Sequence, residues 1–122
     1  MKLEALKKDK VQIPHWMGND NEKADERIRV IWKSFPTAAQ SGKYKPFKYD
    51  GSGNVTLVYD DDGLLRDHLD HIERLEIGVP IETADDILKS EDLRLATLIS
   101  EMRTYALAEA GEITQGESEA SE

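Results

Sequence analysis

The hydrophobic pattern of the chain changes its period directly after Tyr59, and this change constrains the fold more than any other feature of the sequence. Before Tyr59, apolar and polar residues alternate in short runs, which is typical of half-buried β-strands. After it, apolar residues recur every three or four positions, which is typical of amphipathic helices. This order indicates an α+β fold, in which a small, mostly antiparallel sheet in the N-terminal half packs against two to three C-terminal helices.

Two segments near the N-terminus have the pattern of strands that belong to this sheet. Residues 10–13 predict a short strand with Val11 and Ile13 on one face, and Pro14 ends it or places it at a sheet edge. Residues 27–35 give the stronger signal, because apolar residues alternate with arginine and lysine. The apolar face of this second strand is expected to hold Ile28, Val30 and Trp32.

A hairpin is expected where two β-rich runs, 45–49 and 54–59, flank the glycine-bearing loop "DGSG". Lysines and aromatic residues interleave around its first strand, as they do on single-strand nucleic-acid surfaces and on half-exposed hairpin strands. A net charge of −9 opposes binding to nucleic acid or to an anionic membrane. Because aromatic residues on an edge strand suit strand addition, we expect a protein-contact surface. Its predicted members are Tyr44, Phe47 and Tyr49, with Arg103 and Tyr105 on the exposed side of the last helix.

Three helices are expected in the C-terminal half. The first covers residues 62–75, and the second begins at a capping-box pattern made by Thr83 and Asp86. The third is expected to start from a cap at Ser90 and to stop at Gly111. The buried face of the first helix would hold Leu65, Leu69 and Ile72.

The stretch "DDDGLLRDHLDHIERLEI" at the start of the first helix raises the question of a metal site. His68 and His71, with Asp67 or Asp70, supply only part of a ligand set, because two imidazoles one turn apart are half a site. The remaining histidine, His15, lies on the far side of the β region. We therefore expect the histidines at the edge of the buried helical stripe and predict no catalytic residue, cofactor or metal. The aspartates would cap the helix and complement its dipole.

Composition excludes several other classes of protein. The chain has no cysteine, which excludes disulfides, thiolate metal sites and cysteine nucleophiles. No nucleotide-binding, kinase or hydrolase signature is present. No apolar run approaches the roughly 18 residues that span a bilayer, and no signal peptide is recognisable. We expect one cytoplasmic domain at residues 1–110 and a disordered acidic tail at 111–122, which has four glutamates and no basic residue.

Four short phrases follow one another along the chain: "RIRV" at 27–30, "IERLEI" at 72–77, "TADDIL" at 83–88 and "LISEM" at 98–102. Their order resembles that in the small tail-assembly chaperones and related assembly proteins of tailed bacteriophages. The resemblance implies a non-enzymatic protein that acts in the host cytoplasm. It also implies protein partners, such as a tape-measure or tail-tube subunit, or further copies of the same chain.

Three alternatives to a tail-assembly chaperone remain open. A structural component of the phage head or tail would have similar sequence patterns and would stay in the finished particle. An acidic inhibitory module would mimic nucleic acid, although the 16 basic residues mixed with 25 acids argue against a duplex-like array of carboxylates. A metalloenzyme that uses the histidines has the least support from the sequence.

Overall fold

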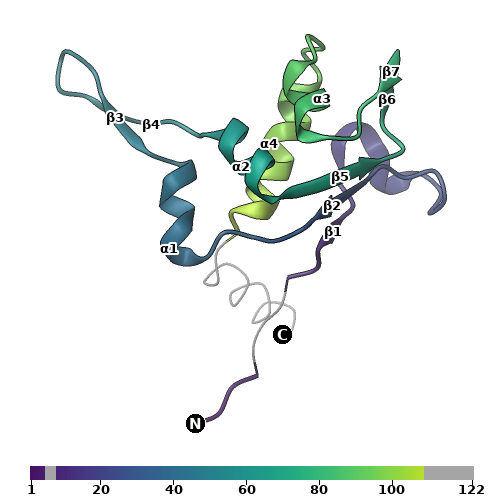
Figure 1. Ribbon diagram of the computed structural model, residues 1–122, viewed down its shortest axis with the longest axis horizontal. Coiled ribbons are helices and arrows are strands. Elements are labelled where there is room, and N and C mark those ends of the chain that lie inside the picture. The colour runs from purple at the N-terminus through teal and green to yellow at the C-terminus, as the bar shows by residue number, and fades with distance from the viewer. Residues whose placement is uncertain (5–7, 109–122) are drawn as a thin grey trace.

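The computed structural model of the chain describes residues 1–4 and 8–108 (Figure 1). It confirms the α+β class, with antiparallel sheets in the N-terminal two-thirds and three of the helices toward the C-terminus. The strands are β1 (Val11–Gln12), β2 (Arg29–Trp32), β3 (Phe47–Tyr49), β4 (Val55–Leu57), β5 (Leu69–Glu73), β6 (Glu76–Ile77) and β7 (Val79–Pro80). The helices are α1 (Ala38–Ser41), α2 (Asp61–His68), α3 (Ala84–Lys89) and α4 (Leu95–Ala106), with 3-10 turns η1 (Trp16–Asn21) and η2 (Gly42–Tyr44).

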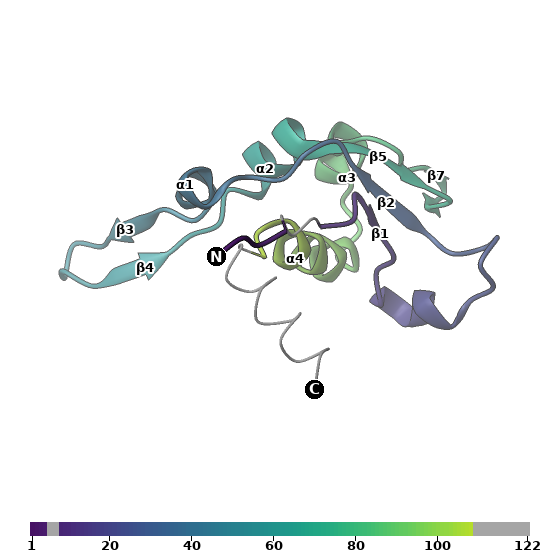
Figure 2. The same ribbon diagram turned by 90° about the horizontal axis from the view of Figure 1, so that it is seen from below.

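The main sheet has the order β1–β2–β5 and is antiparallel throughout. On its central strand, β2, Val30 and Trp32 are almost completely buried, as the alternation of this segment predicts. The longest helix, α4, lies against one face of the sheet (Figure 2), and its Leu98 and Met102 belong to the same buried cluster. The core therefore lies between a small sheet and a layer of helices that follow it in the sequence.

Both edges of the main sheet are covered by other parts of the chain. At the β1 edge, the hydroxyl of Tyr105 donates hydrogen bonds to the backbone carbonyls of Asp9 and Val11. At the β5 edge, the backbone N–H of Ile72 donates to the carbonyl of Glu82 over 2.7 Å. Because unpaired edge groups invite strand addition by another chain, these bonds occupy groups at each edge that would otherwise be open to such pairing.

The prediction of a helix at residues 62–75 is wrong beyond the first half of this range. α2 ends at His68, and the following residues form β5, which pairs with β2. The residues expected on the buried face of that helix are nonetheless buried, although they lie on two different elements. They are Leu65 on α2, and Leu69 and Ile72 on β5.

The pairing of β5 explains how a strand can show the apolar spacing of a helix. Leu69 lies opposite Trp32, but the next pair of opposite residues is His71 and Ile31, so β5 carries one extra residue. Such a β-bulge lets Leu69 and the residue three positions later both face the core. Pairing with β2 therefore outweighs the local helical periodicity at this point of the chain.

The inner face of β1 also differs from the expected one. Gln12 is buried, with 4% of its surface exposed, whereas Val11 is exposed. The Gln12 side-chain oxygen accepts a hydrogen bond from the indole nitrogen of Trp32 over 3.1 Å. A buried indole N–H needs an acceptor, so a glutamine faces inward where the sequence pattern places Val11 and Ile13.

The predicted capping box at the start of α3 is confirmed. The Thr83 hydroxyl accepts a hydrogen bond from the backbone N–H of Asp86 over 3.2 Å. In return, the Asp86 carboxylate accepts one from the backbone N–H of Thr83 over 3.0 Å. These two bonds satisfy donor groups that the first turn of the helix leaves without partners.

The last helix begins later than predicted, so Ser90 is not its cap. The carboxylate of Asp92 accepts hydrogen bonds from both the backbone N–H and the guanidinium of Arg94, which turns the chain before α4. The helix ends at Ala106, and the predicted stop at Gly111 and the acidic tail at 111–122 lie outside the described residues. Within residues 1–4 and 8–108, no helix has the length and apolar content needed to cross a membrane.

We expect Leu98→Ala to lower the free energy of unfolding by about 2–5 kcal/mol, because it leaves a cavity in the core. Leu98 is 0% exposed, whereas Leu93, five residues earlier, is 89% exposed. The matched control Leu93→Ala should change stability by no more than about 0.5 kcal/mol. Urea denaturation of both variants measures the difference, and equal losses would contradict this placement of α4.

Candidate functional site

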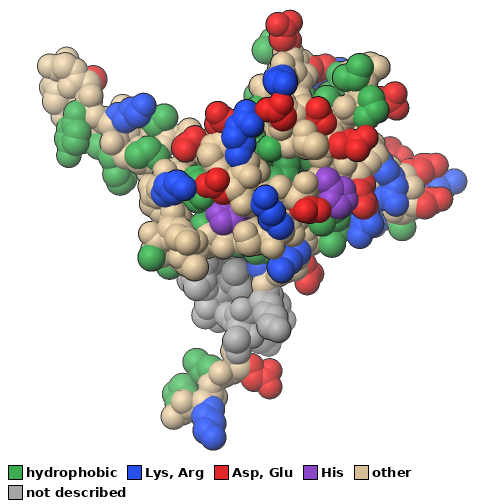
Figure 3. Space-filling view, in the orientation of Figure 1, with side chains coloured by type: hydrophobic (Ala, Val, Ile, Leu, Met, Phe, Trp, Pro, Cys, Tyr) green, Lys and Arg blue, Asp and Glu red, His purple; other side chains and the backbone are tan. Residues whose placement is uncertain are grey.

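A row of exposed apolar side chains lies on a hairpin arm, which comprises residues 45–59. β3 and β4 form this arm, which projects from one end of the molecule (Figures 1 and 2). Phe47 lies opposite Leu57 and Tyr49 opposite Val55, so the four side chains share one face of the two-stranded ribbon. Their exposed fractions are 69%, 41%, 77% and 52%, in that order. Figure 3 shows hydrophobic side chains along the same projection.

The tip of the arm is held by the side chain of Asp50. One carboxylate oxygen accepts hydrogen bonds from the backbone N–H groups of Ser52 and Asn54, at 2.8 and 3.0 Å. These hydrogen bonds, with one from the Asn54 side chain, hold the pKa of Asp50 below its usual range. Gly53 adopts a φ of +84°, which a residue with a Cβ rarely adopts. The turn residues therefore fix the geometry of the tip without help from the rest of the fold.

The base of the arm is anchored in the core through Tyr44. This side chain is 3% exposed, and its hydroxyl donates a hydrogen bond to Asp67 over 2.7 Å. Nε2 of His68 lies 3.0 Å from the same hydroxyl, and Nδ1 lies 2.9 Å from the hydroxyl of Ser34. Since the Tyr44 proton points to Asp67, His68 donates from Nε2 and accepts at Nδ1, as a neutral imidazole does. Burial lowers the pKa of His68, which favours this neutral form.

The five residues predicted to contact partners are therefore divided among four places. Phe47 and Tyr49 lie on the exposed face of the arm, whereas Tyr44 lies in the core below it. Arg103 forms an ion pair with Asp61, with 2.9 Å between the charged groups, and its guanidinium carbon lies 3.9 Å from the ring centroid of Tyr59. Tyr105 covers the β1 edge. The arm thus supplies the exposed members of the predicted surface, and Arg103 supports the end of the arm.

Three further apolar residues of the arm are not among the contact residues that the sequence predicts. Val55, Leu57 and Tyr59 continue the alternation on β4 and its extension, and they are 52%, 41% and 43% exposed. Their period of two was visible in "NVTLVY", but the sequence does not tell whether such a strand faces a core or solvent. The register of the hairpin is what places Val55 and Leu57 beside the aromatic residues of β3.

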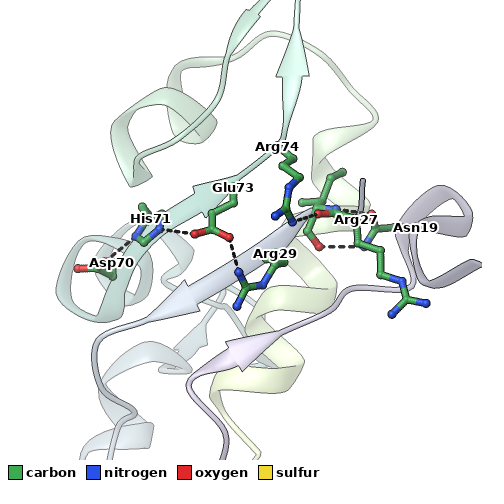
Figure 4. Close-up of polar contacts among 8 residues, drawn as sticks. Asn19, Arg27, Arg29, Asp70, His71, Glu73 and Arg74 are labelled. Atoms are coloured by element: carbon green, nitrogen blue, oxygen red, sulfur yellow. Dashed lines mark hydrogen bonds and ion pairs between the residues drawn. The ribbon is translucent and has the colours of Figure 1, made fainter. Parts of the chain in front are cut away.

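The two histidines of the opening stretch lie in different environments. His68 is buried at the end of α2, and His71 is on β5, where Nδ1 lies 2.6 Å from Asp70 and Nε2 lies 3.2 Å from Glu73 (Figure 4). Glu73 also pairs with Arg29 of β2 over 2.8 Å. Hydrogen bonds to the two carboxylates raise the pKa of His71. The prediction that both histidines lie along one helical stripe is wrong, because α2 ends at His68 and His71 belongs to the strand β5.

The geometry does not assemble these groups into a metal centre. Among residues 1–4 and 8–108, no three histidine, aspartate or glutamate side chains are arranged so that they could hold one ion. His71 instead contributes to a row of charged groups that links β5 to β2 through Glu73 and Arg29. These contacts are partly exposed to solvent, so each adds little to the stability of the fold.

We expect the pKa of His68 to lie below the ordinary value of 6.5 and the pKa of His71 to lie above it. His68 binds a proton less readily when folded, so its contribution to stability falls as the pH drops through 6.5. His71 contributes stability below 6.5 that is lost as the pH rises through its folded pKa. The variant His71→Gln should therefore lose stability more steeply on acidification from neutral pH than the unchanged chain. Imidazole NMR titration and urea denaturation measure both effects, and equal midpoints for the two rings would contradict the assignment.

Comparisons with known proteins provide no relative from which a function could be taken. No family model matches the chain, and neither does any curated protein or any solved structure. The arm and the rest of the described surface are therefore the basis for assigning a function.

Proposed function

We propose that this protein is a non-enzymatic assembly protein that works through protein–protein contacts, with the arm as its main contact surface. The observation that carries the proposal is the row formed by Phe47, Tyr49, Val55 and Leu57 on a ribbon that projects from the domain. Contiguous exposed apolar surface on a soluble domain is typical of a binding site. A two-stranded hairpin is also marginally stable by itself, so burial against a partner would stabilise it.

The arrangement of strand edges supports the same surface. The edges of the main sheet are covered by Tyr105 on one side and by Glu82 on the other. The arm projects away from these covering segments (Figure 2). A partner can therefore bury the apolar face of the arm, and an extended segment of a partner can add to its strands.

Tail assembly in a tailed bacteriophage is the setting that we propose for these contacts. This setting is supported by the resemblance of the sequence phrases to those of small tail-assembly chaperones. A protein with this role would act in the host cytoplasm. A tape-measure or tail-tube subunit would then be the partner of the arm. A structural component of the head or tail could use the same surface, and the presence of the protein in purified particles would distinguish that role.

We expect the double variant Phe47→Ser with Tyr49→Ser to weaken partner binding by about tenfold or more, because aromatic anchors dominate contact surfaces of this kind. The chain is co-expressed with tape-measure and tail-tube proteins of a tailed bacteriophage, and the affinity of each purified pair is measured. Stability should change by no more than about 0.5 kcal/mol, since both side chains are exposed.

The control for this experiment is Lys48→Ser, which changes the opposite face of the same strand. This variant should bind the partner within about threefold of the unchanged chain, since rim charges contribute little affinity. Undiminished binding by the aromatic double variant would overturn the role of the arm. Binding that is lost equally in both variants would point to the strand edge rather than to the apolar face.

A further inference from the structure

A groove lies at the end of the domain opposite the arm. It has a volume of about 530 Å³ and runs between η1 on one side and the β6–β7 hairpin on the other. In Figures 1 and 2 these elements lie at the far end of the domain from β3 and β4. The volume of the groove is within the range of protein sites that bind a ligand.

Apolar side chains from three separate segments of the chain line the groove. They are Trp16, Met17, Ile28, Leu75 and Ile77. Leu75 belongs to the core, whereas Met17 is 67% exposed, so the apolar lining continues from the core out to solvent. A methionine side chain is unbranched and polarizable, and it adapts readily to the shape of an apolar partner.

The walls of the groove are held in place by contacts within the chain. The buried side chain of Asn19 accepts a hydrogen bond from the backbone N–H of Ile28 over 2.6 Å and donates to two carbonyls, so η1 is tied to the start of β2 (Figure 4). Met17 and Arg74 both line the groove, and they are the two non-glycine residues of the described chain that have a positive φ, at 50° and 66°. Unusual backbone of this kind persists where the surrounding structure holds it, often at binding sites.

Three exposed glutamates also line the groove, and their carboxylates have no basic partner. Within residues 1–4 and 8–108, none of the three forms an ion pair. Glu22 and Glu26 belong to the segment that follows η1, and Glu76 lies across the groove on β6. Negative charge is therefore present on both walls.

The two arginines that line the groove do not cancel this charge. Arg94 forms an ion pair with Asp92 over 2.6 Å, and its hydrogen bonds lower the pKa of Asp92 to about 2. Arg74 donates to the backbone carbonyl of Arg27 over 3.0 Å (Figure 4). The three carboxylates thus outnumber the single guanidinium that is not paired with an acid, and an occupant that is both apolar and basic suits the groove.

We infer that the groove binds a segment of a partner protein in which apolar side chains are flanked by lysine or arginine. The apolar side chains of the segment bury against Trp16, Ile28 and Ile77, and its cations approach the carboxylates on the two walls. Lysine and arginine fit such a site well, because their aliphatic stems pack on apolar surface while the charged ends stay beside carboxylates and water. The same carboxylates repel an acidic segment. This inference is independent of the proposed function of the arm, and it gives the chain a second contact surface at its other end.

The probe for this site is the peptide Lys-Leu-Leu-Lys with both ends blocked, titrated into the full chain and followed by NMR. The indole N–H of Trp16 reports on the groove, and that of Trp32, which is buried in the core, reports on the integrity of the fold. We expect the Trp16 signal to shift and saturate with a dissociation constant of about 1 mM or lower, while the Trp32 signal stays in place.

Two further peptides separate the contributions of charge and apolar surface. Glu-Leu-Leu-Glu keeps the apolar residues and reverses the charge, and Lys-Ser-Ser-Lys keeps the charge and removes the apolar residues. Each should bind at least about tenfold more weakly than the probe, because the groove offers both carboxylates and apolar surface. Binding of either one as tightly as the probe would overturn the inference.

The matched variants of the chain place the peptide on the molecule. Glu26→Lys with Glu76→Lys, both at exposed positions of the groove, should weaken binding of the probe at least about tenfold. The control Glu4→Lys with Glu91→Lys has the same net charge and changes exposed residues that do not line the groove. It should bind within about threefold of the unchanged chain, because salt screens charges away from the site. Equal losses in the two double variants would show attraction to the overall charge and would overturn the inference.

The arm variant, Phe47→Ser with Tyr49→Ser, keeps this inference separate from the proposed function. It should bind the probe as tightly as the unchanged chain does, since the arm and the groove lie at opposite ends of the domain (Figure 1). Loss of the probe from this variant would place the peptide on the arm and overturn the groove as its site. A Trp16 signal that does not move at about 10 mM peptide would also overturn the inference, and it would leave the proposed function of the arm untouched.

Discussion

The antiparallel pairing of β2 with β5 is the contact on which the rest of the fold depends. It brings Val30 opposite Ile72 in the core and ends α2 at His68, where the sequence by itself favours a longer helix. At one end of this pair of strands, His68 bonds to Tyr44 and thereby anchors the arm. At the other end, the chain turns at Arg74, which has a φ of 66°, and continues into the β6–β7 hairpin. The arm is thus positioned by the same two strands that organise the core.

The arm is exposed, but its construction is that of an ordered element. Its tip is closed by Asp50, and its base is held by hydrogen bonds from Val58 to the Pro46 carbonyl and from Asp60 to the Tyr44 carbonyl, at 3.0 and 2.7 Å. A binding segment that is already in its bound conformation loses less conformational entropy when a partner covers it. This feature favours a specific contact over non-specific hydrophobic association, because only a surface that matches a fixed ribbon can bury all four apolar side chains.

Local sequence signals were reliable where neighbouring residues decide the structure. The hairpin, the capping box of Thr83 and Asp86 and the buried face of β2 all follow from short patterns, and the structure has them. The strand β5 could not be predicted in the same way, since a bulge gives it the spacing of a helix. Contacts between distant segments, such as the hydrogen bond from Trp32 to Gln12, decide which face of β1 turns inward.

The candidate site was predictable only in part for the same reason. Tyr44, Phe47 and Tyr49 alternate with lysine in one short phrase, yet the structure buries the first and exposes the other two. What separates them is the hydrogen bond of the Tyr44 hydroxyl to Asp67, a residue 23 positions later.

The exposed apolar face of the arm would also allow copies of the chain to stick to one another, and two features oppose this. The net charge of −9 repels one copy from another. The strands of the arm are only three residues long, and Lys48 lies on the face of β3 opposite Phe47 and Tyr49. Short strands with charged residues oppose edge-to-edge pairing between copies. A surface that binds the arm must therefore match its apolar face closely enough to outweigh this repulsion.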